Sequence, residues 1–194
     1  MSRILIPPQY QGCTFFDFDE AQQRVVKAWL DAENPGLLTL YGPVGTGKTR
    51  CLYAIYAQAS TPACHVEFWT VSSLVRRLQS LQACDCRWKY DDFLNIICGR
   101  PGESEYEREE RKWRCGSIPV NMLLLDDFGT EKRTEFVLAA VQEILDLREK
   151  WGLPTAISTN LTMNQIKVAW GDRIASRLNG GKMVKFTGKD RRGK

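Results

Sequence analysis

The sequence predicts an α/β domain, a three-layer sandwich built on a mostly parallel sheet of about five strands. Three observations lead to this prediction. Short apolar runs alternate with segments of helical periodicity along the 194 residues. One of these runs leads into a glycine-rich turn that closes with Gly-Lys-Thr. Polar side chains follow two further runs, where parallel strands would end at one edge of the sheet.

Composition narrows the class of protein. Hydrophobic residues make up 43% of the chain and charged residues 26%, as in an ordinary globular protein. No apolar run approaches the roughly 18 residues that a membrane span needs. The proline-rich start is too short for a signal peptide. We therefore expect a cytoplasmic protein with no membrane partner.

Two regions are expected, an N-terminal arm with its helix (residues 1–36) and the main α/β domain (residues 37–194). The arm carries three closely spaced aromatic residues, Phe15, Phe16 and Phe18. They either pin the arm onto the domain or offer an apolar slot to a nucleotide base.

Periodicity and turn residues divide the chain into elements. Asp19 is placed to cap the arm's helix, over residues 20–32. In the main domain, apolar runs of strand length alternate with segments of helical spacing. The expected strands are 37–41, 63–70, 120–125, 153–158 and 182–187. The expected helices are 48–59, 72–81, 132–150, 161–169 and 172–178.

Residues 82–119 are expected to form a helical insert between the second and third strands. A helix is predicted over 88–97, and alternating charges over 103–114 indicate an exposed helix. The insert either contacts a partner or DNA, or is simply solvated. At the other end, residues 182–194 form a last strand and a basic tail, which either touches nucleic acid or aids solubility.

The seven cysteines are expected to be reduced thiols, because an odd count argues against a closed disulfide framework. The Cys84-Asp85-Cys86 stretch, with Cys98 and Cys115 downstream, has C-x-C spacing instead of the spacing usual for zinc. We expect buried or idle thiols here in preference to a metal site.

The stretch from Gly42 to Thr49 matches the phosphate-loop pattern G-x-x-x-x-G-K-[ST] between a strand and a helix. Its glycines let consecutive N–H groups point into one concavity that holds phosphate oxygens. The next helix adds its N-terminal dipole there. We expect ATP as the ligand. The residues expected to bind it are Gly42, Pro43, Val44, Gly45, Thr46, Gly47, Lys48, Thr49 and Arg50.

A pair of carboxylates, Asp126 and Asp127, ends the apolar run 120–125. The Thr49 hydroxyl and Asp126 are expected to hold Mg²⁺, which prefers oxygen ligands. Asp127 would orient and polarise the attacking water, since phosphoryl transfer depends mainly on positioning and charge neutralisation. Acids after a strand can also cap the next helix, which is the competing interpretation.

Three further side chains are candidates for catalysis. Asn160 follows the neighbouring strand and would bond the water or the γ-phosphate. Arg173 and Arg177 lie four residues apart, on one helical face. One of them, with Arg177 slightly preferred, would reach the nucleotide of a neighbouring subunit as an arginine finger. The alternative is a surface ion pair with Asp172.

Together these motifs resemble the ATPase domain of the DnaC/IstB group of AAA+ proteins, which includes helicase loaders and ATPase helpers of transposons. In that comparison residues 42–49 are Walker A, residues 123–129 Walker B, 158–160 sensor I and 172–178 box VII. An Asp-Asp pair stands where most AAA+ proteins have Asp-Glu.

The resemblance implies a P-loop (ASCE-type) AAA+ ATPase domain over residues 37–194 that assembles as a homo-oligomer and hydrolyses ATP at subunit interfaces. The implied role is a DnaC-like helicase loader in DNA replication, with a replicative DNA helicase as partner. Loaders of this group touch single-stranded DNA through helices at the place of residues 82–119. Because the chain ends soon after the last expected strand, no full C-terminal lid is expected.

Three other functions are compatible with these motifs, and one of them is a nucleotide-gated adaptor that binds ATP but hardly hydrolyses it. An IstB-like helper of DNA transposition would bind a transposase and prefer duplex DNA. A small-molecule P-loop kinase would need a lid and an acceptor pocket, and no lid motif is visible. Asn160 and the paired arginines at AAA+-like positions disfavour the kinase.

Overall fold

The computed structural model describes residues 5–83, 87–99, 119–188 and 190. At its centre lies a five-stranded sheet in the order β2-β3-β4-β1-β5, with parallel pairing throughout. The predicted class, strand number and strand direction are therefore confirmed. The strands are β1 (Leu37–Tyr41), β2 (Val66–Thr70), β3 (Met122–Phe128), β4 (Thr155–Thr159) and β5 (Lys182–Lys185).

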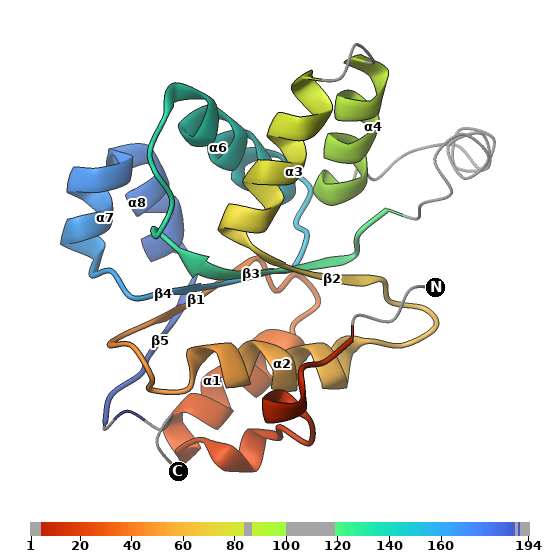
Figure 1. The fold of residues 1–194 in the computed structure, drawn as a ribbon. Helices are drawn as coiled ribbons and strands as arrows, with labels where there is room; N and C mark the ends of the chain where they lie inside the picture. Colours follow the sequence, from red (N-terminus) through yellow and green to blue (C-terminus); the bar gives the residue numbers. More distant parts are fainter. Residues whose placement is uncertain (1–4, 84–86, 100–118, 189, 191–194) are drawn as a thin grey trace.

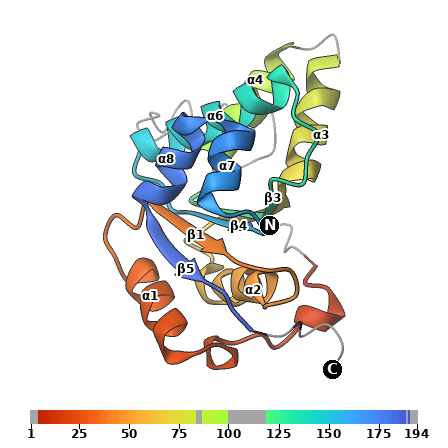
Figure 2. The same cartoon turned by 90° about the vertical axis from the view of Figure 1, so that its left-hand side faces the viewer.

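Helices cover both faces of the sheet and give the three layers that the sequence predicts (Figure 1). Among the described residues, five helices lie on one face: α3 (Val71–Ala83), α4 (Arg87–Cys98), α6 (Glu135–Lys150), α7 (Met163–Trp170) and α8 (Asp172–Gly180). On the other face lie α1 (Glu20–Leu30) and α2 (Lys48–Ala59), as the turned view in Figure 2 shows.

The central strands are apolar on both sides because both of their faces are covered. Side chains alternate between faces along a strand. Thus Leu123 and Leu125 enter the core under α3 and α6, whereas Leu124 enters the core with α1 and α2. The continuous apolar run before Asp126 is the sequence signature of this double burial.

The N-terminal arm packs on the α2 side of the sheet. Asp19 caps α1 as predicted, since its carboxylate accepts a hydrogen bond from the backbone N–H of Gln22 at 2.8 Å. Phe15 and Phe18 are buried, and the Phe18 ring meets Phe186 edge-on. Phe16 does not pin the arm, because it is 85% exposed. The alternative, that it contacts a nucleotide base, stays a prediction.

Several element boundaries differ from the prediction. β2 begins at Val66 and not at residue 63, because an isolated bridge between Thr61 and Cys64 forms a turn first. β3 runs on to Phe128, where residue 125 was expected as the last. The predicted helix 88–97 is confirmed as α4. The predicted helix 103–114 and the cysteines at 84, 86 and 115 lie outside the described residues.

One buried arginine joins four elements at the amino-terminal edge of the sheet. Arg148 of α6 is 1% exposed, and its Nε donates to the Thr155 hydroxyl at 2.8 Å. Its two terminal nitrogens donate to the backbone carbonyls of Ile97, Val120, Asn121 and Pro154. Burial lowers the pKa of Arg148 to about 10, so the side chain remains charged near neutral pH.

Candidate nucleotide-binding site

The loops after three neighbouring strands meet at one edge of the sheet. In the strand register, Thr159 of β4 lies opposite both Tyr41 of β1 and Phe128 of β3. The segments that follow Tyr41 and Thr159 are the phosphate loop and Asn160, and the Asp126-Asp127 pair lies just before Phe128. Ligands of parallel α/β sheets bind at this carboxyl-terminal edge.

The phosphate loop adopts a backbone that only glycine accommodates. Gly42, Gly45 and Gly47 have φ values of 144°, 77° and 106°. A Cβ on Gly42 would collide with the carbonyl oxygen of Phe186, and one on Gly45 with the carboxylate of Asp190. Backbone conformations of this kind let consecutive N–H groups point into one concavity, as a phosphate loop requires.

Two side chains hold the loop in this shape. Lys48, the first residue of α2, is 5% exposed, and its ammonium donates to the carbonyls of Gly42 at 2.8 Å and Pro43 at 2.6 Å. The Thr46 hydroxyl donates to the same Pro43 carbonyl at 2.8 Å. The positive charge of Lys48 thus lies inside the loop, beside the N-terminus of a twelve-residue helix.

The other predicted loop residues differ in exposure. Val44 is 49% exposed, as an apolar side chain at the tip of the loop. Arg50 turns toward the arm, where its guanidinium pairs with the carboxylate of Asp17 at 3.4 Å. The structure therefore links Arg50 to the N-terminal arm.

Thr49 and Asp126 lie together, as a shared magnesium site requires. The Thr49 hydroxyl donates to Oδ1 of Asp126 at 3.2 Å, and the Ser158 hydroxyl donates to the same oxygen. Asp126 is 4% exposed. Burial raises its pKa, and the charge of Asp127 adds to this effect, while the hydrogen bonds from Ser158 and Thr49 oppose it.

These residues fit Mg²⁺ because the ion takes oxygen ligands, commonly one or two from the protein with water and phosphate oxygens for the rest. Bound Mg²⁺ would favour the ionised form of Asp126 and offset the cost of its burial. Elsewhere in the described residues, no group of three or more His, Cys, Asp or Glu side chains is arranged to hold a metal.

Asp127 lies in a β-bulge. The pairing with β4 shifts between Leu125 and Phe128, so β3 contains one more residue here than its partner. Asp127 takes the left-handed backbone conformation, with φ 57°. Its N–H donates to the Ser158 hydroxyl at 3.0 Å. The bulge turns the half-buried Asp127 differently from a regular strand residue, and it explains why β3 continues past the expected end.

A neighbouring hydroxyl fixes the turn that carries Asn160. Thr159 donates to the carbonyl of Phe128 at 2.8 Å and accepts from the N–H of Leu161 at 3.1 Å. Asn160 lies between Thr159 and Leu161 and is half-buried. It is at the same edge of the sheet as the start of the phosphate loop. Its position suits a side chain that bonds a water or a phosphate oxygen.

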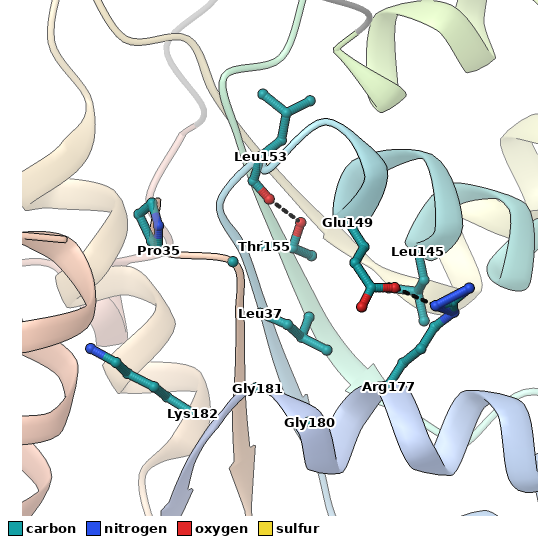
Figure 3. A pocket seen from close by; sticks show the side chains of 11 residues that line it. Pro35, Leu37, Leu145, Glu149, Leu153, Thr155, Arg177, Gly180, Gly181 and Lys182 are labelled. Atoms are coloured by element: carbon teal, nitrogen blue, oxygen red, sulfur yellow. Dashed lines mark hydrogen bonds and ion pairs between the residues drawn. The ribbon is translucent and has the colours of Figure 1, made fainter. Parts of the chain in front are cut away.

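Arg173 and Arg177 lie away from the chain's own phosphate loop. Arg177 lines a cavity of about 360 Å³ with Leu37, Thr155 and Lys182, which are the first residues of β1, β4 and β5 (Figure 3). This cavity is thus at the amino-terminal edge of the sheet. Both arginines pair with Asp146 of α6, and Arg177 also pairs with Glu149.

The sequence pattern did not predict the structural roles of Ser158 and Arg148. Ser158 was noted only as part of a motif, although its position on the strand beside β3 could have signalled a partner for the carboxylates. Arg148 lies in a segment rich in charges and gives no signal of its burial.

The chain has a fully parallel sheet, a phosphate-loop backbone and a buried carboxylate beside it, and this α/β fold is similar to that of the DnaC helicase loader. No family model matches the sequence. In sequence, the chain is 26% identical over 196 aligned positions to the uncharacterized protein YdaV of Escherichia coli K12, covering 96% of this chain and 70% of YdaV.

Solved structures with this fold include two replication proteins. The DnaC helicase loader superposes with a TM-score of 0.65 at 17% identity, over 93% of this chain and all of that one. The replication initiator DnaA, bound to AMPPCP and single-stranded DNA, gives a TM-score of 0.73 at 19% identity, over 95% of this chain. The chain spans about half (52%) of the length of that DnaA.

Within the described residues, no helix is both long enough and apolar enough to cross a bilayer.

Proposed function

We propose that this chain is an ATP-dependent, DNA-associated AAA+ ATPase that acts in DNA replication as a helicase loader. The observation that carries the proposal is the contact between Thr49 and Asp126, which joins the phosphate loop to a buried carboxylate. The similarity of fold to the DnaC helicase loader supports the loader role. We propose that its partner is a replicative DNA helicase. We also propose that the chain acts in the cytoplasm.

In this mechanism the loop N–H groups and Lys48 bind the β- and γ-phosphates of ATP. Thr49 and Asp126 hold Mg²⁺, which neutralises charge on the phosphate oxygens when bound. Asp127 accepts a hydrogen bond from the attacking water and aligns it, and Asn160 holds that water or a γ-phosphate oxygen. The chemistry therefore needs few side chains, provided that their positions are fixed.

Hydrolysis takes place at the interface of a homo-oligomer. Arg177 lies at the sheet edge opposite the chain's own phosphate loop, so within one subunit it is badly placed for that subunit's nucleotide. An arginine supplied by a neighbour stabilises transition-state charge and is worth about 10³–10⁵ in rate in comparable enzymes. Arg177, with Arg173 beside it, fills this role between subunits. A dilute monomer is accordingly a slow ATPase.

The experiment is steady-state ATPase activity against protein concentration, without DNA, with single-stranded DNA and with duplex DNA. The proposal expects specific activity to rise steeply with concentration and with single strands. Stimulation by duplex alone would contradict the loader role and favour an IstB-like helper of transposition. A specific activity that changes neither with protein concentration nor with added DNA would contradict both the loader and the transposition helper. It would favour a small-molecule kinase.

A further inference from the structure

A buried serine links the two carboxylates of the candidate site. Ser158 lies on β4, next to the bulge in β3, and is 1% exposed. A serine hydroxyl has one hydrogen to donate and lone pairs that accept. Here it donates to Oδ1 of Asp126 and accepts from the N–H of Asp127 at 3.0 Å. Both functions of one hydroxyl are therefore used on adjacent residues.

The bulge explains why a side chain is needed here. An extra residue in a strand leaves a backbone group without its regular partner across the ladder. At Asp127 the Ser158 hydroxyl takes the place of that partner. The left-handed backbone of Asp127, with φ 57°, is a conformation that costs free energy and persists only when its surroundings fix it.

The same hydroxyl fixes the carboxylate that faces Thr49. Asp126 Oδ1 accepts from both Thr49 and Ser158. Hydrogen bonds from outside the coordination sphere orient carboxylate ligands, and their loss typically lowers metal affinity by about 10–100-fold. Ser158 is thus well placed to set the orientation of Asp126 without contacting nucleotide or metal itself.

We propose that Ser158 is a positioning residue that fixes both the metal-binding orientation of Asp126 and the bulged backbone of Asp127. The inference rests on the proposed function, since it concerns Mg²⁺ and water at the same site. It assigns to Ser158 a role that its neighbour Asn160 cannot fill, because Asn160 lies beyond the strand end.

The test compares Ser158→Ala with Thr155→Val. Both substitutions remove one buried hydroxyl from β4, but Thr155 lies at the opposite end of the strand, where it accepts from Arg148 and donates to the carbonyl of Leu153. Affinity for a fluorescent ATP analogue is measured in EDTA and across a Mg²⁺ titration. Exchange of the Asp127 amide hydrogen is measured without nucleotide or metal.

For Ser158→Ala we expect unchanged nucleotide affinity in EDTA, about a tenfold higher Mg²⁺ concentration at half-saturation, and faster exchange at Asp127. Thr155→Val should leave the Mg²⁺ requirement and the Asp127 exchange unchanged. A Ser158→Ala protein with a Mg²⁺ requirement within about twofold of wild type and unchanged exchange would overturn the inference.

The two proposals fail in distinguishable ways. Wild-type protein that does not bind the ATP analogue with Mg²⁺ would contradict the proposed function and, with it, the metal-positioning half of the inference. The exchange measurement would still decide whether Ser158 fixes the bulge. Wild-type protein that binds normally, beside an unaffected Ser158→Ala variant, would overturn the inference alone.

Discussion

Among the described residues, Asp127 is the only non-glycine residue with a positive φ, which is 57°. Conformations of this kind cost roughly 1–3 kcal/mol and gather at functional sites. Aspartate and asparagine tolerate the left-handed region better than other side chains. The left-handed backbone turns the Asp127 side chain away from the direction of a regular strand residue. This orientation suits the role that we propose for its carboxylate.

Asp127→Asn should therefore keep the fold and ATP affinity but slow hydrolysis at least about a hundredfold, the low end of what a positioned acid–base group contributes. Asparagine keeps the backbone preference and the size of the side chain, but it removes the charge and replaces one acceptor oxygen with an NH₂ donor. ATPase rate and ATP affinity are measured side by side. An unchanged rate would show that Asp127 does not act on the water.

The sequence predicted the phosphate loop and both carboxylates, because a spaced glycine motif and an apolar run ending in acids are strong local signals. It could not reveal that Asp126 and Asp127 lie inside the strand. Paired acids look like a strand end, and what keeps them in the strand is the Ser158 hydroxyl from a distant segment. Contacts of this kind have no local pattern.

At the scale of elements, Arg148 holds the amino-terminal edge of the sheet together. Its donors reach the end of α4, the segment before β3 and the start of β4. The acceptors are backbone carbonyls and one hydroxyl, with no carboxylate among these hydrogen bonds. Arg148 thus joins the segments before β3 and β4 to the end of α4. Charged residues surround Arg148 in the sequence, so the local pattern predicts an ordinary exposed residue at this position.

Arg148→Met should lower the free energy of unfolding by about 3 kcal/mol, because several buried acceptors lose their donor at once. Methionine retains only the unbranched apolar part of the side chain, so the loss reports the guanidinium group and its hydrogen bonds. Urea denaturation measures it. The matched control is Arg24→Met on the exposed side of α1, expected within about 0.5 kcal/mol of wild type. Equal stability of both variants would contradict the assigned role.

At the scale of the whole molecule, the phosphate loop and Arg177 lie at opposite edges of one sheet. Arg177 therefore lies far from the phosphate loop of its own chain, as the role that we propose for it between subunits requires. In the single chain Arg173 and Arg177 are both paired with Asp146. Assembly would have to exchange these ion pairs for contacts with the neighbour's nucleotide.

Mixing two inactive variants tests this arrangement. Arg177→Ala subunits keep an intact nucleotide site, and Asp127→Asn subunits keep an intact arginine. We expect each alone to be at least about tenfold slower than wild type, and the mixture to regain activity where an Asp127→Asn subunit supplies Arg177. The control mixture pairs Arg177→Ala with the double variant. Recovery in both mixtures, or in neither, would contradict action between subunits.

We propose above all that the loop at residues 42–49 binds ATP with Mg²⁺. Equilibrium binding of ATP measures this property without depending on hydrolysis, DNA or assembly. Wild-type protein and Lys48→Ala are compared with and without Mg²⁺, with circular dichroism to verify that both are folded. We predict that the wild type binds, that Mg²⁺ strengthens binding, and that Lys48→Ala weakens it at least about tenfold, because a charge-assisted contact to phosphate is lost. Equal affinity of the two folded proteins for ATP would contradict the account.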